Sequence, residues 1–372
     1  MPCDSATLLR DATFPVVVEG GTYGDALEAC DADGCAVRRL DFVVHRPTCG
    51  GACPPASPVA VIIIHAGGYV RNDACADCWS MEVADFFASR GALAIAVDYR
   101  LRRDDGLAPE GFGDGYANRF GNSWRPSPAA MWAAIRDARA AARHARGALG
   151  LDCVLAAGNS AGATSAVAMA ALGDEAAYRD VLAPDGAYDA TLAYLDVSSA
   201  VDGALAFAPT VDGVDVLDDA ADVWAAASAP LYVAHNDGDP TNDVANSEYV
   251  AATYGGAVEV EILAGDAHAI ADAPRALAAG LAFLGARGVV DLRDAAAPGG
   301  AEFRRSWNAS ACAVCGSSSS SGGDGADLAI VVAAAAIFIL GVGGAVVAGL
   351  AVRRRRPSTH EDPEELAKVI PS

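Results

Sequence analysis

Short apolar segments alternate with longer helix-like segments along most of the chain. Eight apolar runs have the length and composition of buried strands: 14–19, 40–45, 59–65, 92–99, 153–158, 204–208, 231–235 and 258–263. Four longer stretches are expected to form helices, near 79–90, 128–149, 161–172 and 273–286. Strands that alternate with helices indicate a largely parallel sheet covered by helices on both faces. We therefore predict an α/β domain over residues 12–290, with a mostly parallel eight-stranded sheet.

The C-terminal region departs from this alternation. Residues 328–352 contain no charged side chain, and about 20 apolar residues suffice to cross a bilayer, so we predict one transmembrane helix there. Four arginines follow at 353–356, which predicts a cytoplasmic tail over 353–372 by the positive-inside rule. Residues 291–327 contain a Ser/Gly-rich run and are predicted to be a stalk and linker. Asn308 in this stalk is a candidate glycosylation site.

Two orientations of this membrane protein are possible. The arginine flank predicts that the domain before the span is extracellular or lumenal. The first residues lack the charged start and apolar core of a signal peptide, so this orientation requires that the sequence is truncated at its beginning. The alternative is a tail-anchored protein with a cytosolic domain, which would send four arginines across the membrane. The charge rule favours the first orientation.

The net charge of the chain limits the kinds of partner that it can bind. The chain has 48 acidic and 26 basic residues, which gives a net charge of -22. This charge repels phosphates, so no nucleic-acid partner is expected.

Ten cysteines suggest an oxidising compartment. Most of them lie close together in the sequence as pairs: Cys30/Cys35, Cys49/Cys53, Cys75/Cys78 and Cys312/Cys315. We predict that these cysteines form disulfides, whose connectivity the sequence leaves open, with zinc binding by the second and third pairs as the alternative. Cys153 begins a predicted core strand and is expected to be a buried free thiol.

The segment Gly158-Asn159-Ser160-Ala161-Gly162 has the pattern G-x-S-x-G. It follows a predicted strand and opens a predicted helix, the setting of a nucleophile elbow. Glycines permit the sharp turn, and an oxyanion is favoured at the helix N-terminus. Ser160 is therefore the candidate nucleophile. The earlier segment His65-Ala66-Gly67-Gly68-Tyr69 also ends a strand, where a glycine loop supplies backbone N–H groups to an oxyanion.

The base and the acid are expected after the serine in the chain. His45, His65 and His144 precede Ser160, and His360 follows the predicted span. His268 lies in a short loop after the last predicted strand and is the candidate base, while His235 at a strand end is expected to have a hydrogen-bonding role. Asp237 and Asp239 follow the strand that ends at His235, and the residues alone leave both open as the acid.

These segments together resemble an α/β-hydrolase of the esterase/lipase branch that includes hormone-sensitive-lipase-like and feruloyl-esterase-like enzymes. HAGGY resembles the branch's HGGG[FW] loop, Val97–Leu101 resembles its V-D-Y-R-L strand end, and GNSAG resembles its elbow. In the family's H-G-x-x-D-P-x-V turn the acid lies four residues after the histidine, which selects Asp239. Ala66, Asn236 and Ala269 stand where the family has glycine, which leaves the pocket shape open.

The resemblance implies a serine hydrolase that cleaves carboxylic esters through an acyl-enzyme. Ser160, Asp239 and His268 would form the catalytic triad, and the N–H groups of Gly67, Gly68 and Ala161 the oxyanion hole. No cofactor or metal is expected, and the partner is a small-molecule ester. The alternatives are a non-catalytic, cholinesterase-like adhesion or receptor ectodomain, and an amide or peptide hydrolase with the same triad.

Overall fold

The computed structural model describes residues 7–10, 14–31, 34–48, 59–70, 77–101, 120, 128–174, 194, 196–215, 217, 219–270 and 272–293. These residues belong to the first of two units into which the chain divides, 1–319 and 320–372. The predicted span 328–352, the stalk 291–327 beyond residue 293, the sequon at Asn308 and the tail all lie outside them. Within the described residues, no helix has both the length and the apolar character that crossing a membrane requires.

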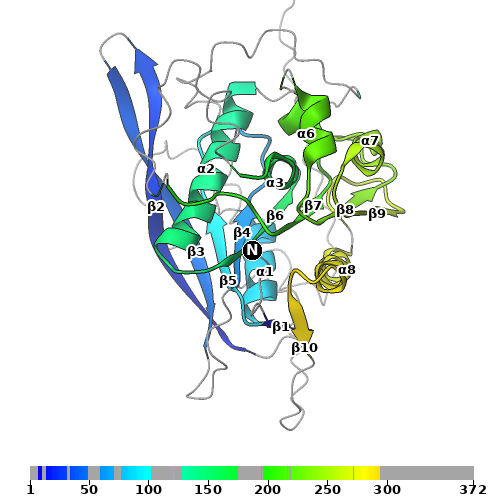
Figure 1. Cartoon of the computed structure of the whole chain (residues 1–372), viewed down its shortest axis with the longest axis horizontal. Helices are drawn as coiled ribbons and strands as arrows, with labels where there is room; N and C mark the ends of the chain where they lie inside the picture. The colour runs from blue at the N-terminus through cyan, green and yellow to red at the C-terminus, as the bar shows by residue number, and fades with distance from the viewer. Residues whose placement is uncertain are drawn as a thin grey trace, which may run out of the picture. The chain divides into compact units, whose positions relative to one another are not determined.

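The described residues contain an eight-stranded sheet in the order β2-β3-β5-β4-β6-β7-β8-β9 (Figure 1). Its strands are β2 (Val16–Asp31), β3 (Gly34–Pro47), β4 (Val59–Ile64), β5 (Leu93–Val97), β6 (Cys153–Asn159), β7 (Gly203–Phe207), β8 (Leu231–Asn236) and β9 (Val258–Leu263). Pairing is antiparallel for β2–β3 and β3–β5 and parallel for every pair from β5 to β9. The prediction of a mostly parallel eight-stranded sheet is confirmed.

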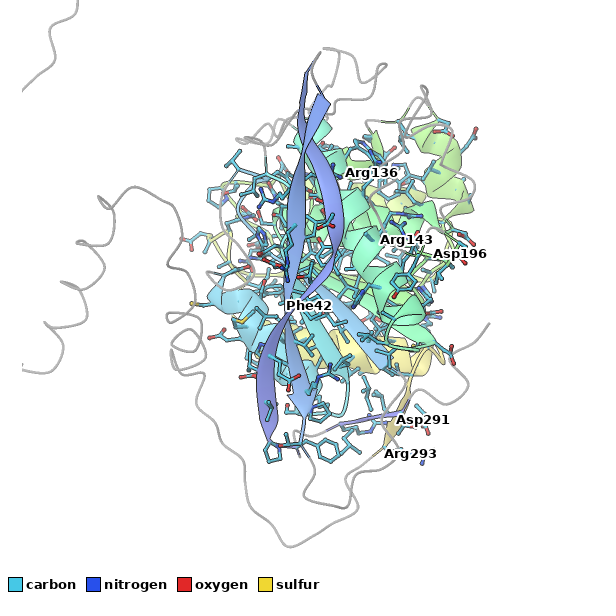
Figure 2. All side chains as sticks on the ribbon, turned by 90° about the vertical axis from the view of Figure 1, so that its left-hand side faces the viewer. Phe42, Arg136, Arg143, Asp196, Asp291 and Arg293 are labelled. Carbon is cyan, nitrogen blue, oxygen red and sulfur yellow. The ribbon has the colours of Figure 1, made fainter. Side chains whose placement is uncertain are left out.

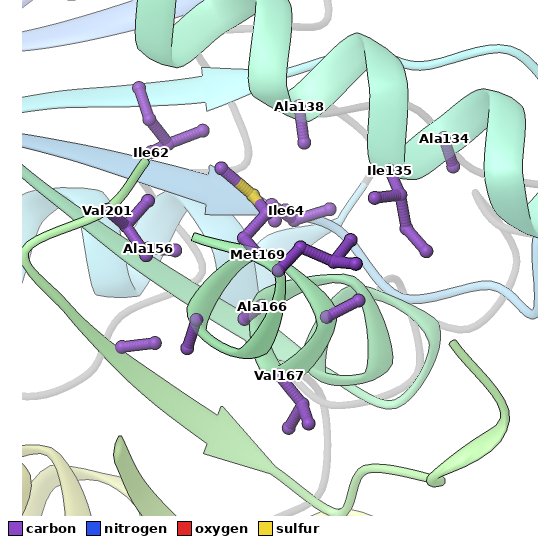
Figure 3. Close-up of a cluster of buried hydrophobic side chains, with 14 of the residues drawn as sticks. Ile62, Ile64, Ala134, Ile135, Ala138, Ala156, Ala166, Val167, Met169 and Val201 are labelled. Atoms are coloured by element: carbon purple, nitrogen blue, oxygen red, sulfur yellow. The ribbon is translucent and has the colours of Figure 1, made fainter. Parts of the chain in front are cut away.

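Helices cover both faces of this sheet. On one face, α2 (Pro128–Gly147) and α3 (Ala161–Leu172) pack on alternate strand residues such as Ile62, Ile64 and Ala156 (Figure 3). On the other face, α1 (Cys78–Ala88) and α8 (Ala273–Ala286) pack on the intervening strand residues, such as Val61 and Ile63. Every side chain of β4 is therefore buried, which explains why its sequence is a continuous apolar run and not an alternating one.

Several short elements have no counterpart among the predicted ones. They are the helices α5 (Asp212–Asp215), α6 (Ala220–Ala226) and α7 (Ala245–Thr253) and the strands β1 (Thr7–Leu9) and β10 (Asp291–Arg293). In an alanine-rich sequence, helical periodicity is weak, and a three-residue strand has no pattern of its own. β1 and β10 pair in parallel as a separate two-stranded sheet, and they lie just outside the predicted boundaries 12–290.

The first two strands of the large sheet are much longer than predicted. β2 pairs with β3 from Val16 to Asp31, whereas β3 pairs with β5 only from Phe42 to His45. The hairpin therefore continues past the rest of the sheet (Figure 1). Figure 2 turns this hairpin towards the viewer, with Phe42 on it and Arg136 and Arg143 on α2 behind it. The predicted runs 14–19 and 40–45 cover only part of the hairpin. Beyond them Tyr23 and Ala26 are also buried in the core, but they lie in a segment rich in glycine and polar residues, so no continuous apolar run marks it.

One cysteine prediction is wrong. Cys153 is fully buried at the start of β6, as expected, but it is disulfide-bonded, as is Cys78 at the start of α1, and no cysteine among the described residues is free. Burial led to the interpretation as a thiol, but burial does not exclude a sulfur partner that tertiary structure brings close. The pairs Cys49/Cys53 and Cys312/Cys315 lie outside the described residues, so their pairing stays a prediction.

Candidate active site

Four loops that carry the candidate residues leave one edge of the sheet. The strands β4, β6, β8 and β9 are parallel, so their C-terminal ends lie at the same edge. Ile64 at the end of β4 is level with Gly158 of β6, and Asn236 at the end of β8 is level with Leu263 of β9. Residues from four distant parts of the sequence thus meet at the carboxyl edge, where open α/β sheets bind ligands.

Ser160 occupies a sharp turn between β6 and α3. Its φ of 55° and ψ of -119° lie in a region that side-chain-bearing residues rarely adopt. The turn is held because Ser160 N–H donates to Phe207 O at 2.9 Å. A Cβ on Gly158 would lie 2.1 Å from Gly162 O, and one on Gly162 would lie 1.9 Å from Ile64 O. Both glycines of G-x-S-x-G are therefore required by close backbone contacts.

Ser160, His268 and Asp239 form one hydrogen-bonded line. Ser160 Oγ lies 2.7 Å from His268 Nε2, and His268 Nδ1 lies 2.7 Å from Asp239 Oδ2. A carboxylate only accepts, so Nδ1 carries the proton and donates to Asp239, which leaves the Nε2 lone pair to accept from the Ser160 hydroxyl. The side chain of Asp239 is fully buried, whereas that of His268 is a quarter exposed. The imidazole thus has the tautomer and the access that a general base needs.

The carboxylate of Asp239 is held in its ionised form. Burial is the largest single influence and raises its pKa, but hydrogen bonds from His235, His268 and the Thr241 amide outweigh burial, so the pKa lies well below its ordinary value. Oδ1 accepts from Thr241 N at 2.8 Å and from Asn242 N at 3.1 Å. An acid that stays ionised stabilises a positive charge on the neighbouring imidazole.

His235 is a second histidine beside the same carboxylate. Its Nε2 lies 3.3 Å from Asp239 Oδ2 and 3.0 Å from Asn242 O. Both are acceptors, so Nε2 carries a proton, and Nδ1 forms a hydrogen bond with the Ser247 hydroxyl, 2.6 Å away. His235 is fully buried. The expected hydrogen-bonding role of His235 is thereby observed, with the candidate acid as one of its neighbours.

The loop that follows β4 packs directly against the serine turn. Its backbone has positive φ at Gly67 (117°), Gly68 (64°) and Tyr69 (63°). Tyr69 is buried and its hydroxyl donates to Ala161 O at 2.6 Å, which fastens this loop to the first turn of α3. Burial raises the pKa of Tyr69 above its ordinary value, so the hydroxyl stays a donor. The candidate oxyanion-hole residues therefore lie in two segments that are joined to each other, Gly67 and Gly68 in the loop after β4 and Ala161 at the start of α3.

The other polar candidates have different partners. Asp237 Oδ1 accepts from Gly265 N at 2.9 Å, so this carboxylate braces the turn. His45 Nδ1 lies 2.8 Å from Asp85, and His65 stacks on Tyr99 with ring centroids 4.0 Å apart. Within the described residues, no cluster of three or more His, Cys, Asp and Glu side chains could hold a metal ion.

Sequence reasoning missed three residues that shape this site. Tyr69 and Ser247 bond to the serine turn and to His235, and Asn236 bonds to the loop of His268. The sequence did show that Asn236 stands where the family has glycine. It did not show where the asparagine side chain points.

Comparisons with known proteins establish the fold. Neither a family model nor a curated protein matches the sequence. Among solved structures, the chain is similar to esterase 2 of Thermogutta terrifontis phosphorylated by paraoxon, with TM-score 0.51 and 18% identity over 74% of this chain and 96% of that chain. It is also similar to the propionate-bound form, with TM-score 0.50 and 19% identity over 76% and 97%. The chain thus has the α/β-hydrolase fold.

Proposed function

We propose that this protein is a serine hydrolase of the carboxylesterase type. The observation that carries the proposal is the line from Ser160 through His268 to the buried Asp239, with 2.7 Å between each pair of atoms. A nucleophile bonded to a base that is itself oriented by an acid is the arrangement of acyl-transfer enzymes. The similarity to esterase structures supports an ester as the substrate.

The geometry gives each residue a step. Ser160 Oγ attacks the ester carbonyl carbon while His268 Nε2 takes the hydroxyl proton. The C–O bond of the ester then breaks, and His268 returns the proton to the leaving alcohol. Water next attacks the acyl-enzyme with His268 again as the base, which releases the acid and restores Ser160. Asp239 keeps its negative charge throughout and stabilises the imidazolium of each step.

The developing oxyanion needs donors close to Ser160. The N–H groups of Gly67, Gly68 and Ala161 are the proposed donors, because their loops are joined through Tyr69 and Ala161 is the first residue of α3. Donors fixed before the reaction are often the largest single contribution to such catalysis. The N-terminal end of α3 adds a favourable partial charge.

Two other functions use the same fold. An adhesion or receptor ectodomain would not require the base, acid and nucleophile to remain aligned, so the intact hydrogen-bonded line favours an enzyme. An amide or peptide hydrolase would use the same residues, and the esterase neighbours favour an ester over an amide.

A fluorophosphonate probe tests the proposal. The probe should react covalently with Ser160, and Ser160→Ala should lose labelling and nearly all turnover of p-nitrophenyl esters, on the order of 10⁶-fold. Ser89→Ala is the matched control, because Ser89 is a buried serine that bonds to Phe86 O on the other face of the sheet. Equal labelling of the Ser160→Ala protein and the wild type would refute the assignment.

We also propose that residues 328–352 anchor the enzyme in a membrane, with the hydrolase domain outside the cytosol and residues 353–372 inside it. The uncharged length of the segment and the four arginines after it support this orientation. Under the same proposal, Asn308 lies on the side where glycans are added and the closely spaced cysteines are in an oxidising compartment. The tail-anchored orientation is the alternative.

A further inference from the structure

Asn236, the last residue of β8, contacts the loop that carries His268 on both sides of the histidine. Its Nδ2 donates to Ala267 O at 2.7 Å and to Ala269 O at 3.0 Å. Both amide hydrogens are therefore used, one on the residue before His268 and one on the residue after it. Among the residues that the structure describes, these are the hydrogen bonds made to the backbone of residues 266–270.

The orientation of this side chain is fixed by its surroundings. Turning the amide over would place Oδ1 against two carbonyl oxygens, so the Nδ2 group must face the loop. Asn236 is 1% exposed, and Gly265 packs so closely that a Cβ there would lie 3.1 Å from Asn236 Cγ. Asn236 Oδ1 is buried without a hydrogen-bond partner among the described residues. An unpartnered buried oxygen is unfavourable, so the amide is not explained by folding stability alone.

The position of Asn236 links it to the rest of the site. Asp239 lies three residues further along the chain, and His235, which precedes Asn236, contacts Asp239. The end of β8 therefore contacts both the acid and the base. The described residues of the loop that carries His268, 264–270 and 272, form no helix or strand, so the path of the loop depends on bonds such as these.

We propose that Asn236 is a positioning residue for His268. By holding the carbonyls of Ala267 and Ala269, its amide fixes the imidazole between Asp239 and Ser160. The inference rests on the proposed hydrolase function. Because Asn236 is buried, it acts through His268 and does not touch substrate. Without these bonds the loop could move, and the imidazole would no longer be aligned between Asp239 and Ser160. Small misplacements of a catalytic group reduce the rate strongly.

The first test is the Asn236→Ala variant. We expect kcat for p-nitrophenyl esters, and the rate of fluorophosphonate labelling of Ser160, to fall about 10- to 100-fold by the cost of misplacement, with KM changed less than about threefold. Asn236→Ser, which keeps one donor, should lie between the variant and the wild type, and it serves if the alanine variant does not fold. Tyr254→Phe is the control, because it removes a buried bond to Ala229 O near the opposite end of β8. The control should keep its kcat.

A second measurement separates positioning from a general structural effect. The proton between His268 Nδ1 and Asp239 should give a low-field resonance in the wild type that is weakened or shifted in Asn236→Ala and unchanged in Tyr254→Phe. An Asn236→Ala protein that folds with unchanged kcat and an unchanged resonance would overturn the proposal. If wild-type protein shows the resonance but no labelling or turnover, the proposed function fails while the positioning role is still tested by the resonance.

Discussion

At the scale of single residues, two carboxylates two positions apart have separate tasks. Asp239 is buried and bonds to His268, whereas Asp237 bonds to the Gly265 amide and is exposed. The residues alone left both open as the acid, and the family's spacing selected Asp239. Neither spacing nor composition indicated the contacts of Asn236, because these depend on a side-chain orientation and on the path of the loop from Gly265 to Asp272.

This difference predicts unequal effects of two similar substitutions. Asp239→Asn should lower kcat by about 10⁴, because an amide that donates to Nδ1 favours the wrong tautomer of His268. Asp237→Asn should keep kcat within about threefold, because its partner is a backbone amide of the turn and an amide oxygen can still accept that bond. Steady-state kinetics with a p-nitrophenyl ester measure both. If Asp237→Asn lowered kcat more than Asp239→Asn, the acid of the triad would be Asp237 and not Asp239.

At the scale of elements, the β6–α3 turn shows what was predictable. Its strand, turn and helix were all expected, because a buried apolar run, a glycine-flanked serine and an alanine-rich helix each have a recognisable sequence. α7, by contrast, was missed, although it supplies Ser247 to His235. Its buried side chains are Asn246, Ser247 and Val250, two of which are polar, so it has no apolar stripe and only tertiary packing defines it.

The close packing of this turn makes its second glycine sensitive. A Cβ at Gly162 would lie 1.9 Å from Ile64 O and 2.8 Å from His65 O, and both are backbone atoms that cannot move alone. Gly162→Ala should lower the free energy of unfolding by at least about 1–3 kcal/mol and slow the labelling of Ser160.

A glycine with open space around it provides the comparison. A Cβ at Gly20 in β2 meets nothing within 4 Å, so Gly20→Ala should change the free energy of unfolding by no more than about 0.5 kcal/mol. Urea unfolding measures both variants. Equal stability of the two would show that the contact between β4 and the serine turn relaxes without cost.

At the scale of the whole molecule, the proposed orientation can be tested independently of the chemistry. The four arginines after residue 352 predict that a tag placed after Ser372 is digested by protease added to sealed microsomes, while the hydrolase domain is protected. A glycosidase should then also shift the mobility of the chain if Asn308 is modified. A protected tag together with a digested hydrolase domain would show the tail-anchored orientation and leave the active-site proposal unchanged.

The parallel pairing of β1 with β10 has a consequence for how the chain acquires its fold. Thr7 lies opposite Asp291 and Leu8 lies opposite Leu292, and Leu8 is completely buried. During synthesis at about 5–20 residues per second, the first strand leaves the ribosome roughly 15 to 60 s before its partner does. Contacts between such distant residues form slowly because a long loop must close first. We therefore expect the eight-stranded sheet to assemble beforehand and the docking of β1 to be the final step of folding.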